Sequence, residues 1–68
     1  MVPVHSRHLA AVGYDESTCV LHIEFRDGHI YAYSEVPAKV HETLMSVKSH
    51  GAHFSHFIHD RYPAVRIA

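Results

Sequence analysis

Cysteine, tryptophan and long apolar runs are scarce or missing in this sequence. Cys19 is the only cysteine, so no disulfide can form within the chain, and the disulfide-built scaffold of many small secreted proteins is excluded. Residues 1–9 lack the basic and then apolar pattern of a secretory signal peptide. No segment approaches the roughly 18 consecutive apolar residues of a membrane-spanning helix. We therefore expect a cytoplasmic protein without membrane contact.

A surplus of either charge is also lacking. Six Lys and Arg stand against seven Asp and Glu, which leaves a formal net charge of −1 with histidine neutral. The basic residues are scattered, which differs from the strongly basic profile of a dedicated nucleic-acid binder. The chain is rich in histidine, however, and protonating all nine would take the net charge to +8. Because histidine titrates between about pH 5 and 8, we expect electrostatics that depend strongly on pH.

Alternating apolar residues predict a sheet. Strands are expected at residues 5–14, 18–25 and 30–33. The middle strand has the clearest pattern, since Leu21, Ile23 and Phe25 alternate with polar residues, as in a half-buried strand. Cys19 would lie at its beginning, where we expect it to act as a small packing residue.

The turn between the last two of these strands decides which side chains are exposed. Asp27-Gly28 predicts a tight hairpin, because this pair supplies the positive φ that such turns need. A two-residue turn would leave Tyr31 and Tyr33 on an exposed face, similar to the stacking surface of single-strand RNA binders. A three-residue turn with Gly28 in a bulge would put both tyrosines on the apolar face with Phe25. We favour the bulge, because so short a chain needs the apolar area of two aromatic rings.

Apolar spacing in the second half predicts two helices. The first opens at Val36-Pro37 and ends near Ser49, and the second begins at Ser49 and stops before Pro63. Their apolar faces consist of Val40, Leu44 and Val47, and of Phe54, Ile58 and Tyr62. Residues 64–68 alternate and are expected to add an edge strand. Residues 1–68 thus predict one small α+β domain, an antiparallel meander of about three strands packed by one main helix and one short C-terminal helix.

An ordered set of residues across the chain resembles a known family. The set reads Val12-Gly13-Tyr14-Asp15, then Leu21-x-Ile23-x-Phe25-x-x-Gly28-x-x-Tyr31-x-Tyr33-x-x-Val36-Pro37, then Ser49-x-Gly51-x-x-Phe54-x-x-x-Ile58-x-x-x-Tyr62. At this spacing, residues 6–62 resemble the KTSC domain, which occurs at the C-terminus of some lysyl-tRNA synthetases and as short bacterial and phage proteins. The resemblance implies a small α+β fold and an RNA-binding role. His50, Ser55 and His59 depart from the family pattern, which often has a basic residue, Asn and Arg at these places.

The segment from Lys48 to Arg66 is the best candidate for binding. A Ser-x-Gly sequence that opens a helix presents free backbone N–H groups, which suit a phosphate. The nucleic-acid-binding residues expected from this pattern and from nearby charge are Lys48, Ser49, Gly51, His59, Arg61 and Arg66. The structural alternative is a helix cap followed by a glycine that a tight turn requires. The functional alternative is a protein-interaction or regulatory module that pairs through an edge strand at residues 64–68.

Catalysis and metal binding are weakly supported. His53, His56 and Asp60 fall close to one face of the second predicted helix, but neither an H-E-x-x-H nor a C-x-x-C motif accompanies them. Cys19 and His22 would point to opposite faces of a strand, so they do not form a nucleophile and base. We expect no enzyme activity, no catalytic residue, no metal and no cofactor.

Overall fold

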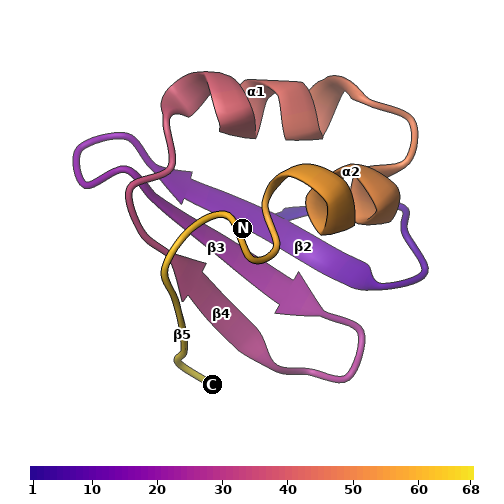
Figure 1. The fold of residues 1–68 in the computed structure, drawn as a ribbon. Helices are drawn as coiled ribbons and strands as arrows, with labels where there is room; N and C mark the ends of the chain where they lie inside the picture. The colour runs from indigo at the N-terminus through magenta and orange to yellow at the C-terminus, as the bar shows by residue number, and fades with distance from the viewer.

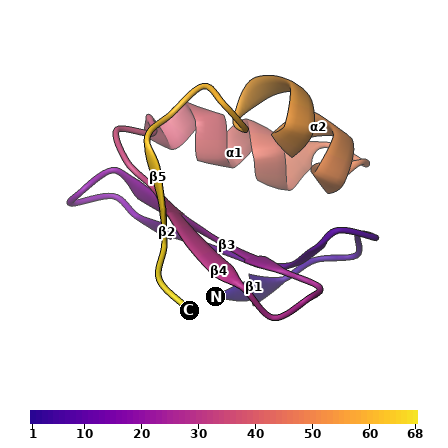
Figure 2. The same ribbon diagram turned by 60° about the horizontal axis from the view of Figure 1, so that its bottom comes forward.

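The computed structural model describes residues 1–68 and consists of one sheet covered by two helices. The sheet is antiparallel with five strands in chain order: β1 (Val2–Pro3), β2 (Leu9–Asp15), β3 (Val20–Phe25), β4 (Ile30–Tyr33) and β5 (Ala64–Arg66). The helices α1 (Ala38–Ser46) and α2 (His50–Phe57) lie side by side on one face of the sheet, and no element covers the other face (Figures 1 and 2). The α+β class and the C-terminal edge strand are confirmed. The pairing of β1 with β2 was not predicted.

The hairpin between β3 and β4 has the bulged register. Glu24 pairs with Ile30, and the N–H of Phe25 donates to the carbonyl of His29 at 2.9 Å, so the turn holds three residues. Gly28 lies within it at φ 94°, a conformation that glycine adopts at little cost. Tyr33 is therefore 3% exposed and belongs to the core. The alternative in which the tyrosines form an exposed stacking surface is wrong.

The core lies between β2, β3, β4 and the two helices. Seven large side chains are almost completely buried: Leu9, Leu21, Ile23, Leu44, Ile58, Val12 and Val36. Phe54 of α2 packs its ring against Phe25 and Tyr33, with centroids 5.6 and 5.4 Å apart, in edge-to-face geometry. Figure 1 shows that α2 lies over the sheet. One aromatic cluster therefore ties the short helix to the sheet.

Two predicted strand beginnings are wrong. The first long strand starts at Leu9 rather than at residue 5, because the N–H groups of His8 and Leu9 donate to Ser6 Oγ and form a local turn. Cys19 does not start β3 but lies exposed in the preceding turn at φ 58°. It is therefore not the packing residue that we expected.

Both helices end earlier than predicted. The first ends at Ser46, and the second ends at Phe57 because the carbonyl of Phe54 accepts from both Ile58 and His59, which closes the last turn. Asp60 then adopts φ 66°, so Tyr62 packs against the core from a loop rather than from the helical face we expected. Neither helix is long and apolar enough to cross a membrane.

Tyr14 links the sheet to the start of α1. Its hydroxyl donates to the carbonyl of Val36 at 2.6 Å, and its ring stacks on His41 with centroids 4.8 Å apart. Burial raises the pKa of Tyr14 above its ordinary value, and the neighbouring Cys19 thiol raises it further. This contact fixes the chain between β4 and α1.

Candidate functional site: a polar pocket at the start of α2

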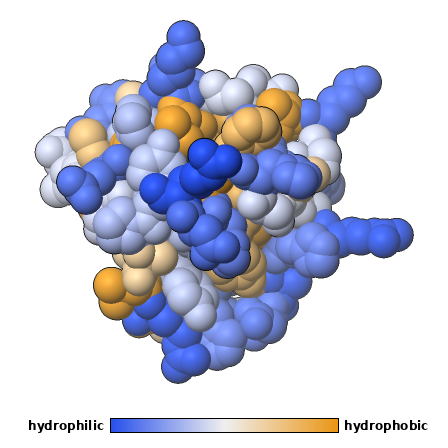
Figure 3. Space-filling view, viewed as in Figure 1, coloured by the Kyte–Doolittle hydropathy of each residue, from blue (hydrophilic) through white to orange (hydrophobic).

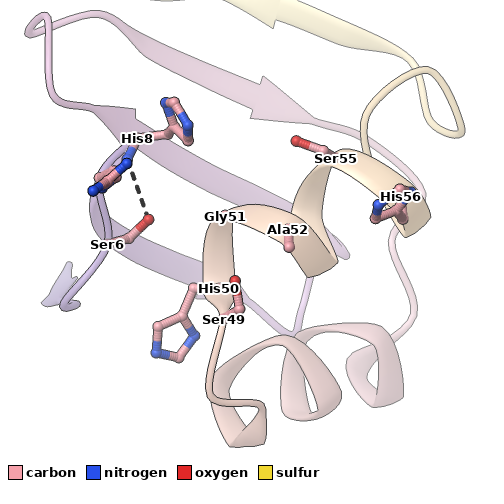
Figure 4. A pocket seen from close by; sticks show the side chains of 9 residues that line it. Ser6, His8, Ser49, His50, Gly51, Ala52, Ser55 and His56 are labelled. Carbon is pink, nitrogen blue, oxygen red and sulfur yellow. Dashed lines mark hydrogen bonds between the residues drawn. The ribbon is translucent and has the colours of Figure 1, made fainter.

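A pocket of about 410 Å³ lies between the beginning of α2 and the loop that precedes β2 (Figure 4). We call it the α2 pocket. The residues that line it are Ser6, Arg7, His8, Ser49, His50, Gly51, Ala52, Ser55 and His56. Ala52 is the single hydrophobic residue among them. The α2 pocket is thus a polar hollow whose only permanent side-chain charge is that of Arg7.

The first turn of α2 supplies hydrogen-bond donors to this pocket. The first N–H groups of a helix have no acceptor within the helix, and here they belong to His50, Gly51 and Ala52. Ser49 occupies the N-cap position, but its side chain makes no capping hydrogen bond. The predicted start of the second helix at Ser49 is confirmed, and Ser49 takes the N-cap position of the structural alternative without a side-chain hydrogen bond. The free amides and the positive end of the helix dipole together favour an anion.

The opposite wall is the loop of residues 6–8, which Arg26 holds in place. Arg26 donates from Nε to the carbonyl of Ser6 and from Nη2 to that of Val4, both at 3.0 Å. Ser6 Oγ in turn accepts from the N–H groups of His8 and Leu9 at 3.2 Å. Figure 4 shows Ser6 and His8 on this loop facing the start of α2 across the hollow. The pocket therefore has two walls that are fixed by hydrogen bonds.

Gly51 sets the distance between the two walls. A Cβ atom at this position would lie 3.1 Å from Ser6 Oγ and 3.5 Å from His8 Cδ2. The first distance is shorter than an ordinary van der Waals contact, so the loop can approach the helix this closely only because residue 51 has no side chain.

His50 anchors the beginning of α2 to α1. Its Nδ1 lies 2.8 Å from the carbonyl oxygen of Leu44, and a carbonyl can only accept, so Nδ1 carries the proton. Figure 4 shows the ring projecting from the helix start below Ser6 in the view and well apart from His8. His50 therefore orients the amides of the first turn, whereas His8, His56 and Arg7 supply the side chains around the hollow.

The predicted binding residues do not form one surface. Ser49 and Gly51 line the α2 pocket, and Lys48 is exposed in the connection that leads to it. His59 and Arg61 lie in the turn after α2, where His59 Nδ1 contacts Asp60 Oδ2 at 3.2 Å. Arg66 lies on β5, opposite Tyr31 in the sheet.

Sequence reasoning missed the loop of residues 6–8 that forms half of the pocket. No spacing pattern connects these residues to residue 51, because the contact arises only from the fold. The one local signal is Ser6 three residues before the first buried residue of β2, which is the arrangement of a side-chain-capped turn.

A second hollow of about 380 Å³ lies between the two helices. It is lined by Lys39, Val40, Thr43, His53, Phe57 and Tyr62. Figure 3 shows apolar side chains gathered over the helices, at the top of the view, with hydrophilic ones around them. With three apolar residues and few fixed donors, this groove does not suit a phosphate.

The structure brings no metal-binding set together. No group of three or more His, Cys, Asp or Glu side chains is placed to hold an ion. His56 and Asp60 do not share a helical face, because α2 ends at Phe57. The exposed Cys19 thiol lies 3.9 Å from the carbonyl oxygen of Glu16 and next to Tyr14.

The chain is similar to known proteins in sequence and in fold. Residues 5–62 match the family model of the KTSC domain. A protein of Tsukamurella paurometabola is 34% identical over 98% of this chain and 100% of its own length. A lysine–tRNA ligase of Nostoc punctiforme is 41% identical over 49 residues, which are 72% of this chain and 9% of the ligase. The crystal structure of a KTSC domain protein from Yersinia pestis superposes with a TM-score of 0.94 at 33% identity, covering 97% of this chain and 93% of that one.

Proposed function

The chain belongs to the KTSC domain family, and we propose that it is a small non-catalytic module that binds RNA through phosphate groups held in the α2 pocket. The observation that carries this proposal is that the first-turn residues with free amides, Gly51 and its neighbours, line a polar hollow beside Arg7. Backbone amides at a helix N-terminus bind phosphate without reading sequence. The module would therefore contribute affinity and position rather than base recognition.

The lysine–tRNA ligase relative supports RNA as the source of the phosphate. The matching part is 49 residues long and makes up 9% of that enzyme, which is the size of an accessory domain rather than of a catalytic one. A ligase that acts on tRNA gains from any additional contact to the RNA backbone. We place the same role on this chain in the cytoplasm, where it would act alone or beside a partner.

The charge of the chain sets the strength of this binding. With a formal net charge of −1, long-range attraction to RNA is absent, and the contact depends on local groups. One or two phosphates in the pocket predict a slope of about −0.7 to −1.4 in log K against log salt for a single strand. Lys48 directly precedes Ser49 and would extend the contact, whereas His59, Arg61 and Arg66 lie outside the α2 pocket.

Amide NMR with short single-stranded and hairpin RNAs, at pH 7.5 and low salt, tests the proposal. We expect shifts at Gly51, Ala52 and residues 6–8 that fade as salt is added. Arg7→Gln should weaken binding by about tenfold or more, in line with the loss of a charged hydrogen bond to phosphate. Arg66→Gln is the matched control, because it removes the same charge from β5 and should change the affinity less than twofold. Equal effects of the two substitutions, or shifts confined to other surfaces, would contradict the assignment.

The outer edge of β5 favours protein interaction as a second candidate function. β5 pairs with β4 on one side only, and all three of its residues are exposed. An unpaired strand edge can accept a strand from another protein. If RNA produces no shifts, retrieval of a partner by the wild-type chain, and its loss when Arg66 is replaced by Pro, would support this alternative, because the register with β4 directs the N–H of Arg66 to the free edge.

A further inference from the structure

The face of the sheet that the helices leave open has an ordered pattern. The strand register places two rows of side chains across the five strands on this face. One row consists of Met1, Gly13, His22, Ala32 and Val65, and the next consists of Pro3, Ala11, Glu24, Ile30 and Ile67. Met1 belongs to the first row because its Cγ lies 3.0 Å from where a Cβ of Gly13 would be. We call these ten residues the open face.

The open face is apolar except at its centre. Met1, Val65 and Ile67 are 55%, 64% and 55% exposed, and they are three of the five large hydrophobic residues that the molecule exposes. His22 and Glu24 have the only charged or titratable side chains among the ten, and they lie next to each other on the central strand β3, while the α-ammonium group of Met1 lies at the β1 edge. Figure 2 shows that neither helix nor loop covers this side of the sheet. Apolar patches of a few hundred Å² on small proteins are often functional.

We propose that the open face binds a second copy of this chain, with His22 of each copy opposite Glu24 of the other. The dimer would have a two-fold axis midway between the two sheets. This axis runs across the strands and passes between the two rows, so it maps each row of one copy onto the other row of the second copy. It places Val65 over Ile67 at one end and Met1 over Pro3 at the other, so exposed apolar groups meet apolar groups. The same operation sets His22 over Glu24 twice, so that neither polar side chain at the centre of the face is buried without a partner.

Self-complementarity distinguishes a second copy from other occupants. A nucleic acid would meet an apolar surface with the Glu24 carboxylate at its centre, and repulsion by that carboxylate disfavours it. An unrelated partner would have to present one acidic group opposite His22 and one basic group opposite Glu24. These two groups would need the spacing of residues i and i+2 of a strand. A second copy carries this pattern by construction, and two sheets packed face to face at about 10 Å form the ordinary β-sandwich interface.

The size of the face predicts a weak dimer. Five strands spaced about 4.8 Å apart give a width of ~24 Å, and two rows with their side chains give a length of ~14 Å. These dimensions fit the extents of 27 × 25 × 21 Å. The resulting ~340 Å² per copy is under half of the ~800 Å² in a standard interface. We therefore expect a dissociation constant of about 0.1–1 mM.

Sedimentation equilibrium and NMR on serial dilutions from about 2 mM test this dimer. We expect concentration-dependent mass and amide shifts at His22, Glu24, Ala32 and Val65. Glu24→Lys and His22→Glu should each weaken the dimer about fivefold or more, because the two-fold axis repeats each change. The double variant H22E/E24H exchanges the two groups and should restore the wild-type constant within about threefold. Phe57→Ser, which changes an exposed residue on α2, is the control and should leave the constant unchanged.

The outcomes separate the open face from other modes of association. A strictly monomeric protein at about 2 mM would overturn the proposal. A dimer that is weakened by Phe57→Ser but not by Glu24→Lys would also overturn the proposal. The same holds if the double variant H22E/E24H dimerises as weakly as the single variants. Melting curves of all variants check that the fold is kept, since neither His22 nor Glu24 contributes to the buried core. RNA binding at the α2 pocket is measured separately, so either proposal can fail without the other.

Discussion

Replacing Gly51 by alanine tests how closely the two walls of the α2 pocket approach. The new methyl group would lie 3.1 Å from Ser6 Oγ and 3.5 Å from His8 Cδ2. It would therefore occupy the space between the walls, and the loop of residues 6–8 would have to move by a few tenths of an ångström. We expect RNA or inorganic phosphate to bind at least about tenfold more weakly, since the amides of α2 would no longer face an open hollow.

The effect of this change on stability is much smaller, because two terms oppose each other. Alanine in place of glycine favours a helix by up to about 1 kcal/mol. Moving Ser6 strains the hydrogen bonds that Ser6 Oγ accepts from His8 and Leu9, each worth about 0.5–1.5 kcal/mol. The net change in unfolding free energy should be a loss of about 0–1.5 kcal/mol. Binding should therefore fall far more than stability does.

Urea unfolding and an RNA titration of the same sample measure the two quantities. Gly13→Ala is the matched control, because its Cβ would also be crowded, 3.0 Å from Met1 Cγ, but on the open face. Combining Gly51→Ala with Ser6→Ala gives the methyl group room, so the two stability costs should not add. If Gly51→Ala binds RNA as tightly as the wild type, the α2 pocket is not the contact.

Three further predictions concern the fold itself. Phe54→Ala should cost about 3–5 kcal/mol, which is the whole net stability of so small a domain, whereas exposed Phe57→Ala should cost under about 0.5 kcal/mol in the same urea titration. Arg26→Met removes two hydrogen bonds to the N-terminal segment and should lower the free energy of unfolding by about 1–2 kcal/mol. Amide hydrogen exchange in residues 4–8 should become faster, and an unchanged exchange rate would show that Arg26 does not hold this segment in place. Burial raises the pKa of Tyr33, and Tyr31 and Asp60 raise it further. Above the ordinary tyrosine pKa of 10.0, the unfolded state therefore releases the Tyr33 proton while the folded state still keeps it. Stability should therefore fall as the pH rises from about 10 upward, and Tyr33→Phe should flatten that decline in urea midpoints measured across this range.

Local patterns were sufficient to predict the β3–β4 hairpin and the helical layer. Asp-Gly and the alternation around Ile23 act within a few residues, and burial of Tyr33 required the bulge at Gly28. The extent of α2 was not predictable in the same way. The i, i+4 spacing of Phe54, Ile58 and Tyr62 looks helical, yet a turn at Asp60 delivers Tyr62 to the same core. A spacing pattern reports which side chains are buried, and several backbone paths can satisfy it.

Half of the candidate site could not be predicted because it depends on contacts distant in sequence. Gly51 and Ser6 are 45 positions apart, and their approach follows from the pairing of β2 with β3 and from Arg26 reaching the carbonyl of Val4. The segment from Lys48 to Arg66 seemed continuous in sequence, but the fold separates it. Its beginning faces the α2 pocket, while Arg66 lies on the edge strand.

Because the α2 pocket joins distant parts of a small domain, its occupation should be visible in stability. The pocket exists only when the loop of residues 6–8, Arg26 and α2 are all in place, so a ligand that binds it binds the folded state alone. Such a ligand at 100 times its dissociation constant stabilises the fold by about 2.7 kcal/mol. That gain is comparable to the roughly 3–5 kcal/mol that a core of this size supplies. RNA that fills the pocket should therefore raise the melting temperature by about 10 °C or more, since 1 kcal/mol corresponds to roughly 4–8 °C in a domain of this length. In Gly51→Ala, binding that is tenfold weaker would leave about 1.4 kcal/mol of this gain at the same RNA concentration. The rise in melting temperature should therefore fall to about half of the wild-type value or less, which separates binding in the pocket from binding elsewhere on the surface.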